Sequence, residues 1–290
     1  MFVFLWSSML WSQTDRFFSF NIDNDLYFLS DYYYSSGIFF QWGKKKETTK
    51  DSLSRYRLWE LGQEMYTPSD RYSENTADYD YPYGGWSFVK YTQWREHTPN
   101  AQYLYGIQVG VTGDWSLARW MQNNYHKTVL GLPFNAWVDQ QPEALHVNLL
   151  SAYFYQKPLS QFLTFESQFY SRLGTQRIDV GSRLGFNLGR TSVLNKGDNP
   201  YSGNTLGEGI YLGVNASYVA HDYMLSGSMF NDEAPFVVEN NQQRLIIEAG
   251  FARRTPAWKL LMLFSSRSKD TPVQNKKNHL YLNFTISRLF

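Results

Sequence analysis

The chain has 290 residues, a formal net charge of +1 and no cysteine. A near-neutral charge offers no basic surface to nucleic acid, and the lack of cysteine excludes disulfides, thiolate metal sites and cysteine nucleophiles. Aromatic residues make up 18% of the sequence and recur between polar residues. Beyond the N-terminus no apolar run approaches the roughly 20 residues of a membrane-spanning helix, whereas a membrane strand needs only about 9 to 11 alternating residues. The composition therefore favours an all-β fold, a transmembrane antiparallel barrel.

The chain begins with a short apolar run, Phe2 to Trp11, followed by Ser12 and Gln13. This run is typical of the end of a secretory signal peptide cleaved near Gln13, although it lacks a positively charged start. The sequence predicts a signal-peptide remnant over residues 1–13 and a single outer-membrane barrel domain over 14–290. A barrel strand or a plain N-terminal tail is the alternative for the first residues.

The first hairpin concentrates side-chain oxygens at its tip. Asn24 and Asp25 end the first strand, and Ser30 and Asp31 precede the second. Carboxylate, amide and hydroxyl oxygens are the ligands that Ca²⁺ prefers, while an ordinary polar turn is the alternative. Strand alternation places Asn24 on an apolar face that points toward lipid, where a bare amide is costly, so this position predicts a functional residue.

Period-two alternation predicts about twelve strands. An even number of strands puts both termini on the periplasmic side of an outer-membrane barrel, and odd-numbered strands then run outward. The predicted strands are 17–24, 34–45, 58–67, 86–96, 101–113, 147–156, 163–173, 177–189, 209–220, 240–253, 258–267 and 279–290.

Loop lengths test this count, because inner turns should be short and outer loops long. The short inner connections are 97–100, 156–161 and 255–257, and the long outer ones are 69–85, 114–146 and 268–278. Two connections disagree, because 46–57 and 190–208 are long yet fall on the inner side. One strand could therefore be miscounted.

The outer loop 114–146 contains a predicted short helix. Ser116 is the expected N-cap, Gly131 the expected stop, and apolar residues recur between them at helical spacing. Gln122 and His126 lie four residues apart and so share one face of this helix. A histidine can take a proton from water near neutral pH, and a nearby cation can stabilise the resulting oxyanion. A loop plug carrying a surface histidine is the alternative.

The last strand alternates most clearly. Leu282, Phe284 and Ile286 share the face expected to meet lipid, and polar residues occupy the other face. The terminal Phe290 is typical of the signal by which the barrel-assembly machinery recognises bacterial outer-membrane proteins. The expected location is the bacterial outer membrane.

An ordered set of motifs resembles the outer-membrane lipid A 3'-O-deacylase family of Gram-negative bacteria. The order and spacing hold over roughly residues 17–145, and weaker similarity continues through Leu225 to Phe230 and on to Phe290. The motifs are Asn24-Asp25, Ser30-Asp31, Tyr33-Tyr34-Ser35-Ser36-Gly37, Tyr66-Thr67-Pro68, Asp80 to Trp86, Gly110 to Gly113, Gln122 to His126, and Trp137 with Gln140.

The resemblance implies a calcium-dependent hydrolase that cleaves the 3'-linked acyloxyacyl ester of lipid A. Its site would lie outside the barrel wall, facing the outer leaflet, with lipopolysaccharide and membrane lipids as partners and the protein a monomer. Carried over by motif, His126 is the general base that activates water, and Asp25 binds or orients around Ca²⁺. Asn24 binds the metal or polarises the ester carbonyl, and Ser35 stands at the metal and catalytic position where the family usually has Thr.

Gln122, Tyr34 and Trp137 are the substrate-binding residues that the resemblance implies. The chain also departs from the family, with Gly113-Asp114 where Gly-Pro is usual. Leu132 stands near the position where a second acidic residue after the histidine is expected. Asp139 or Glu143 could take that place.

Two other functions compete with this one. An outer-membrane phospholipase would need a serine nucleophile held by a histidine and a third orienting residue, and no histidine lies close in sequence to a strand serine in a convincing arrangement. A non-enzymatic barrel, either a pore or a structural protein, would leave the oxygen cluster at the rim and the histidine-bearing loop helix unexplained.

Overall fold

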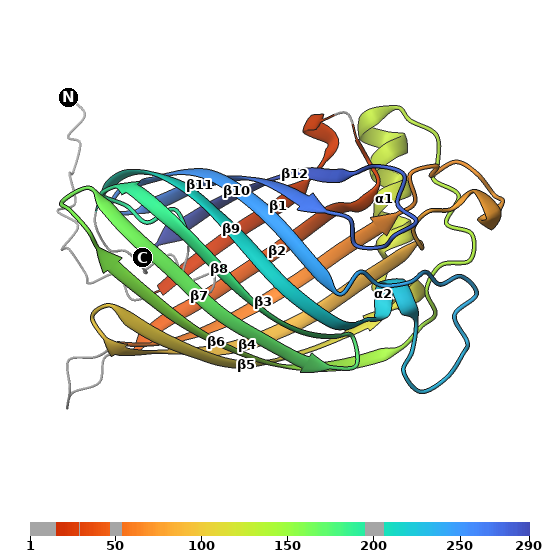
Figure 1. Ribbon diagram of the computed structural model, residues 1–290. Helices are drawn as coiled ribbons and strands as arrows, with labels where there is room; N and C mark the ends of the chain where they lie inside the picture. The colour runs from red at the N-terminus through yellow and green to blue at the C-terminus, as the bar shows by residue number, and fades with distance from the viewer. Residues whose placement is uncertain (1–15, 29, 47–53, 195–205) are drawn as a thin grey trace, which may run out of the picture.

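The fold is a closed antiparallel β-barrel, seen in a computed structural model that describes residues 16–28, 30–46, 54–194 and 206–290 (Figure 1). Each strand pairs with its neighbours in sequence, and β12 pairs with β1 to close the ring. The proposed signal-peptide remnant, residues 1–13, lies outside the described residues. The strands are β1 (Arg16–Asn24), β2 (Tyr33–Lys46), β3 (Arg55–Thr67), β4 (Gly84–Thr98), β5 (Ala101–Thr112), β6 (Leu145–Pro158), β7 (Leu163–Gly174), β8 (Arg177–Gly189), β9 (Gly207–Asp222), β10 (Gln243–Arg254), β11 (Trp258–Ser268) and β12 (Asn278–Leu289).

Short helices occupy the connections. They are η1 (Leu26–Phe28), η2 (Thr76–Asp78), η3 (Gly113–Ser116), α1 (Ala118–Tyr125), η4 (His126–Leu130) and α2 (Tyr223–Ser226). In the described part of the chain, no helix is long and apolar enough to cross a membrane. The predicted strand set is confirmed element by element, and the suspicion of a miscounted strand is wrong.

The seam between the first and last strands is fully paired. Its register runs from Phe17 opposite Leu289 to Asn24 opposite Leu282. The Ser19 hydroxyl donates to the Ser287 hydroxyl across the seam at 2.8 Å. A closed ring leaves no strand edge with unsatisfied backbone groups, and only such a sheet is stable in a bilayer.

The two faces of the wall separate as the alternation predicts. Phe284 lies on the outer face between Ile22 of β1 and Met262 of β11, whereas Asn283 points inward and donates to Asn21 at 2.6 Å. Apolar side chains of the outer face stay exposed to the surroundings and form what we call the apolar belt. It includes Phe18, Phe40, Trp42, Leu61, Val89, Ile107, Val109, Leu149, Phe169, Leu184, Leu212, Ile247 and Met262.

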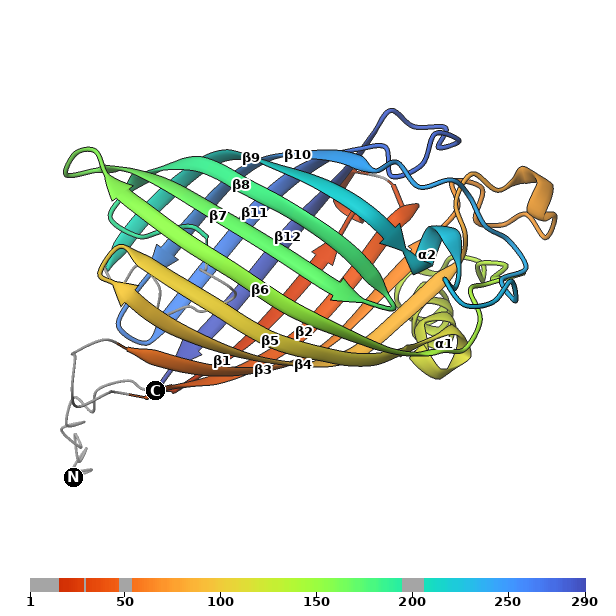
Figure 2. The same ribbon diagram turned by 60° about the horizontal axis from the view of Figure 1, so that its bottom comes forward.

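The barrel has two unlike ends. The terminal end holds the short turns after β4, β6 and β10, and there the Arg16 N–H donates to the Phe290 carbonyl at 2.9 Å. The loop end carries α1, α2 and the long connections 68–83, 113–144, 223–242 and 269–277, and Figures 1 and 2 show this end from two sides. This division matches the predicted sorting of short and long connections, except that the long connections after β2 and β8 lie at the terminal end.

Side chains occupy the lumen near both ends. After β8 the chain turns inward, and Val193 and Leu194 pack against Tyr211 and Leu261 of the inner wall. The first part of the long inner connection, residues 190–194, therefore packs inside the barrel. Near the loop end the lumen holds an aromatic cluster that includes Tyr33, Tyr34, Tyr66, Tyr81 and Trp86.

Candidate functional site

The loop helix rests against the outside of the wall. Gln63 of β3 and Ser87 of β4 both donate to the Ser116 carbonyl, the latter at 2.7 Å. Gly85 allows this approach, because a Cβ at Gly85 would lie 2.3 Å from Ala118 Cβ. The sequence placed the helix correctly, and only a glycine on β4 lets it come this close.

Both ends of the helical segment depend on left-handed residues. The N-cap is Leu117, with φ of 59°, so the prediction of Ser116 as N-cap is wrong by one residue. Ser116 still contributes, because its hydroxyl accepts from the Ala118 N–H at 3.3 Å and donates to the Gly113 carbonyl at 2.6 Å. Gly131, with φ of 67°, ends the segment as predicted.

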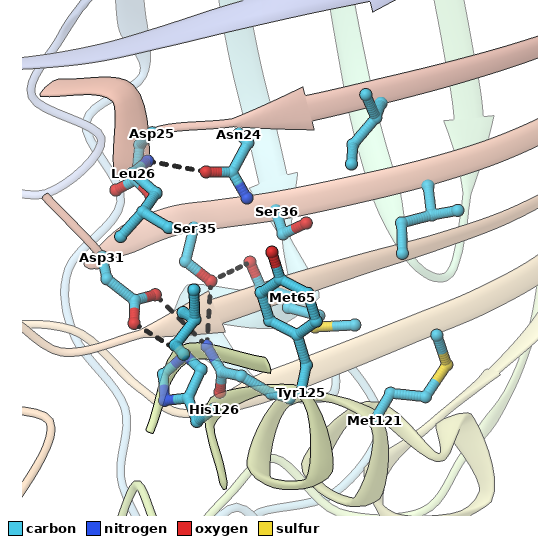
Figure 3. Close-up of a pocket in the computed structure, with 14 residues that line it drawn as sticks. Asn24, Asp25, Leu26, Asp31, Ser35, Ser36, Met65, Met121, Tyr125 and His126 are labelled. Carbon is cyan, nitrogen blue, oxygen red and sulfur yellow. Dashed lines mark hydrogen bonds and ion pairs between the residues drawn. The ribbon is translucent and has the colours of Figure 1, made fainter. Parts of the chain in front are cut away.

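A cavity of about 160 Å³ lies between this helical segment and the outer faces of β1, β2 and β3. In Figure 3 the polar residues of the hairpin tip face the helix across it. One part of its lining is polar and the rest is apolar. The lining residues are Ile22, Asn24, Asp25, Leu26, Asp31, Ser35, Ser36, Ile38, Met65, Met121, Gln122, Tyr125, His126 and Leu130.

A β-bulge decides which residues of β2 face this cavity. The register against β3 shifts between Tyr34 and Ser36, so Ser35 and Ser36 both line the outer cavity. Tyr34 turns into the lumen, where its hydroxyl donates to Asp23 at 2.7 Å. The expectation of Tyr34 as a substrate-binding residue is therefore not met, because its side chain lies on the opposite side of the wall.

The buried pair of His126 and Asp31 is the chemical centre of the cavity. His126 Nε2 lies 3.0 Å from Asp31 Oδ2, and both side chains are nearly inaccessible to solvent. The second ring nitrogen, Nδ1, is buried without a hydrogen-bond partner. A carboxylate at this distance favours the tautomer with the hydrogen on Nε2, in which the lone pair of Nδ1 is unused.

Asp31 is the acidic partner that sequence reasoning missed. Arg71 lies 3.4 Å from the same carboxylate oxygen, and the Thr67 hydroxyl donates to the Asp31 carbonyl at 3.2 Å. The two acids suggested instead, Asp139 and Glu143, are exposed and do not line the cavity. The acid precedes the histidine by 95 positions, so a search downstream of the histidine could not find it.

Gln122 connects the helix to the wall. Its amide nitrogen lies 3.3 Å from Ser35 Oγ and 3.4 Å from Asp31 Oδ1, and its oxygen accepts from the Trp137 indole at 2.8 Å. Trp137 stacks on Tyr83, with ring centroids 5.0 Å apart. Trp137 does not line the cavity itself, and its contact with Gln122 makes it a positioning residue.

Asp25 carries an unused buried oxygen. Its Oδ2 accepts from the Tyr32 N–H at 3.0 Å, whereas Oδ1 is buried without a partner. Burial, helped by the negative charge of Asp31, raises the pKa of the Asp25 carboxyl to about 8. The charged form of Asp25 lacks a positive partner, and a cation bound at Oδ1 would supply one.

Asp25 shares the cavity with several side-chain oxygens. Among the described residues, no three His, Cys, Asp or Glu side chains gather as a metal cluster. The Asn24 amide oxygen, which accepts from the Leu26 N–H at 2.7 Å, and the Ser35 hydroxyl line the same cavity. This donor set fits Ca²⁺, which accepts amide, hydroxyl and water oxygens beside a carboxylate.

Backbone strain gathers around the cavity. Four non-glycine residues of the described chain have positive φ: Tyr33, Leu117, Trp137 and Asp139. Tyr33 precedes the bulge, Leu117 starts the helix, and Trp137 holds Gln122. Such conformations cost about 1 kcal/mol or more each and persist where packing enforces them, which is common at functional sites.

A closed barrel with an apolar belt is the architecture of an outer-membrane protein, and this one carries a buried His–Asp pair on its outer wall. The family model described as "Outer membrane protein LpxR" matches residues 1–290. The chain belongs to this family.

Solved structures show the same fold. LpxR from Salmonella typhimurium is 14% identical, with a TM-score of 0.73 over 94% of this chain and all of that one. An outer membrane channel from Pseudomonas putida F1 is 10% identical, with a TM-score of 0.53 over 97% of each chain. No curated protein matches the sequence. These likenesses establish the barrel fold.

Proposed function

We propose that this protein is a calcium-dependent hydrolase that removes the 3'-linked acyloxyacyl chain from lipid A in the outer leaflet. The observation that carries the proposal is the buried pair of His126 and Asp31, 3.0 Å apart, in a cavity on the membrane-facing side of the wall. Membership of the LpxR family supports the same substrate. The proposal also directs the loop end outward, where lipid A resides.

His126 acts as the general base. Asp31 holds the proton on Nε2, and Nδ1 takes a proton from a water molecule as the water oxygen bonds to the ester carbonyl carbon. The bond from that carbon to the sugar oxygen then breaks, and His126 returns the proton to this oxygen. The products are a free acyloxyacyl carboxylic acid and a sugar hydroxyl.

Asp25, with Asn24 and Ser35, would hold the calcium ion. When bound there, the ion supplies positive charge to the carbonyl oxygen as it becomes negative. Gln122 holds the side chains of Ser35 and Asp31 in place, because its amide nitrogen contacts both. The fit rests on the unpartnered Asp25 Oδ1 and on an all-oxygen donor set.

Direct attack by water distinguishes this mechanism from a serine esterase. Among the described residues no serine hydroxyl contacts His126, and Ser35 is engaged with Gln122 and the Met65 carbonyl. A relay of serine, histidine and acid needs the first contact. The site therefore favours hydrolysis without an acyl-enzyme over the phospholipase mechanism.

Mass spectrometry of lipid A from cells with and without the protein tests the proposal. We expect the loss of one acyloxyacyl unit with wild-type protein and no loss with His126→Ala. The matched control is His97→Ala, an exposed histidine at the terminal end. Phospholipids that have lost an acyl chain, with lipid A intact, would establish the phospholipase instead. Unchanged phospholipids and unchanged lipid A would refute hydrolysis.

A further inference from the structure

The helical segment on the outer wall exposes an unusual number of large apolar side chains. Trp115, Leu117, Trp120, Val129 and Phe134 are between 53% and 65% exposed. The opposite side of the segment buries Ala118, Gln122 and His126 against the wall. The segment is therefore amphipathic, with its apolar side turned away from the protein.

The wall fixes the level of this segment relative to the apolar belt. Its anchor points are Gln63 and Ser87, which bond to the Ser116 carbonyl from the outer face. The next outward-facing residues toward the terminal end are Leu61 and Val89, which are 49% and 43% exposed and belong to the belt. Two residues of a tilted strand correspond to about 5 Å along the membrane normal. The segment thus lies directly beside the hydrocarbon layer.

The chemistry of the exposed side suits the boundary between acyl chains and head groups. Tryptophan concentrates at this level of membrane proteins, and interfacial helices sink about 5 to 10 Å into it. Exposed cations accompany the apolar residues: Lys127 Nζ lies 5.3 Å from the centre of the Phe134 ring, and Arg119 is paired with Asp114 at 2.9 Å. Because Asp114 neutralises Arg119, Lys127 supplies the positive charge beside this apolar surface, which suits a lipid with anionic head groups.

We propose that the outer side of residues 115–134 inserts into the outer leaflet, with anionic glycolipid as its partner. Continuity with the apolar belt selects a lipid surface as the occupant. The insertion itself rests on the outer-membrane location and does not depend on the proposed hydrolysis.

The insertion has a consequence for the site, which rests on the proposed function. The cavity is lined by Met121 and Tyr125 of the inserted segment, both labelled in Figure 3, and by Ile22 and Ile38 of the wall. Ile38 stands two residues from Phe40 of the belt. The cavity therefore opens sideways into the leaflet, and a lipid reaches His126 without leaving the membrane.

Site-directed spin labelling measures the insertion directly, because the chain has no native cysteine. Trp120→Cys and Val129→Cys are each labelled in full-length protein in vesicles that contain lipopolysaccharide. The references are Phe169→Cys in the belt and Ala77→Cys in an exposed loop. We expect collisions with oxygen to exceed those with a water-soluble nickel complex at 120 and 129, as at 169. Labels at 120 and 129 that behave like the label at 77 would overturn the proposal.

A functional measurement separates insertion from catalysis. Trp120→Ser should lower the rate on lipid A in vesicles about tenfold, since burying one large aromatic side chain is worth about one order of magnitude in affinity. The rate on detergent-dispersed lipid A should stay at the wild-type value. An equal loss in both assays would contradict the role in membrane engagement. If wild-type protein were inactive in both assays, the proposed function would fail while the spin-label result still decided the insertion.

Discussion

Gly85 offers the sharpest test of how the wall positions the catalytic histidine. A Cβ added there would lie 2.2 Å from Ser116 Oγ and 2.3 Å from Ala118 Cβ. Carbon atoms in contact prefer about 3.5 to 4.0 Å, so the helical segment must retreat by more than about 1 Å. His126 moves with the helix, whereas Asp31 stays with the β1–β2 hairpin. A displacement of about 1 Å typically costs about 100-fold in rate, and we expect this loss of kcat/KM for Gly85→Ala.

Gly84→Ala is the matched control. The neighbouring residue faces the lumen, and its added Cβ would meet Met224 Sδ at 2.6 Å, the far end of a flexible side chain. Both variants should show the wild-type change in electrophoretic mobility on heating, the mark of a folded barrel, because the strand pairing is intact. Initial rates of lipid A deacylation then compare the two. A Gly85→Ala protein as fast as Gly84→Ala would refute the reasoning that close helix docking sets the site.

The remaining predictions concern the base, the metal and the wall. His126→Ala should fold normally yet hydrolyse lipid A about 10² to 10⁴-fold more slowly. Single-turnover hydrolysis by the wild type in H₂¹⁸O should place the label in the released acid. A trapped acyl-serine would contradict direct attack by water. Asp31→Asn should lower the rate of hydrolysis by no more than His126→Ala does. The double variant should be no slower than His126→Ala alone, and rate measurements on all three proteins check both statements. Asp25→Asn should abolish the stabilisation by Ca²⁺ over chelator, measured as a shift in Tm; equal stabilisation of both proteins would remove Asp25 from the metal site. Phe284→Lys should weaken folding into bilayers by about 2 to 4 kcal/mol near the midplane, and an unchanged urea titration would show that the strand faces the other way.

Much of the fold could be predicted from the sequence because period-two alternation is a local signal. Each strand repeats an outward apolar residue and an inward polar one, and the last strand, with Phe284 outward and Asn283 inward, shows the pattern most clearly. The loop helix was predictable for the same reason, since its spacing and the Gly131 stop are local. His126, Asn24, Asp25 and Ser35 were predicted by motif and do line one cavity.

The rest depends on geometry that no local pattern carries. One extra residue in the β2 bulge reverses the facing of Tyr34, which strict alternation places on the side of Ser36. Asp31 meets His126 only because the hairpin tip and the loop helix close over the same patch of wall. The contribution of Trp137 is indirect as well, because it acts on Gln122 from outside the cavity.

The side chains inside the barrel bear on where it can act. Water-filled porins admit solutes because their interiors are open, whereas here Val193 and Leu194 pack onto the inner wall near one end and a cluster of tyrosines around Trp86 occupies the lumen near the other. These side chains narrow the lumen at both ends, and the cavity that holds His126 lies on the outer wall instead. The barrel thus presents its polar site to the surroundings and not to its own interior.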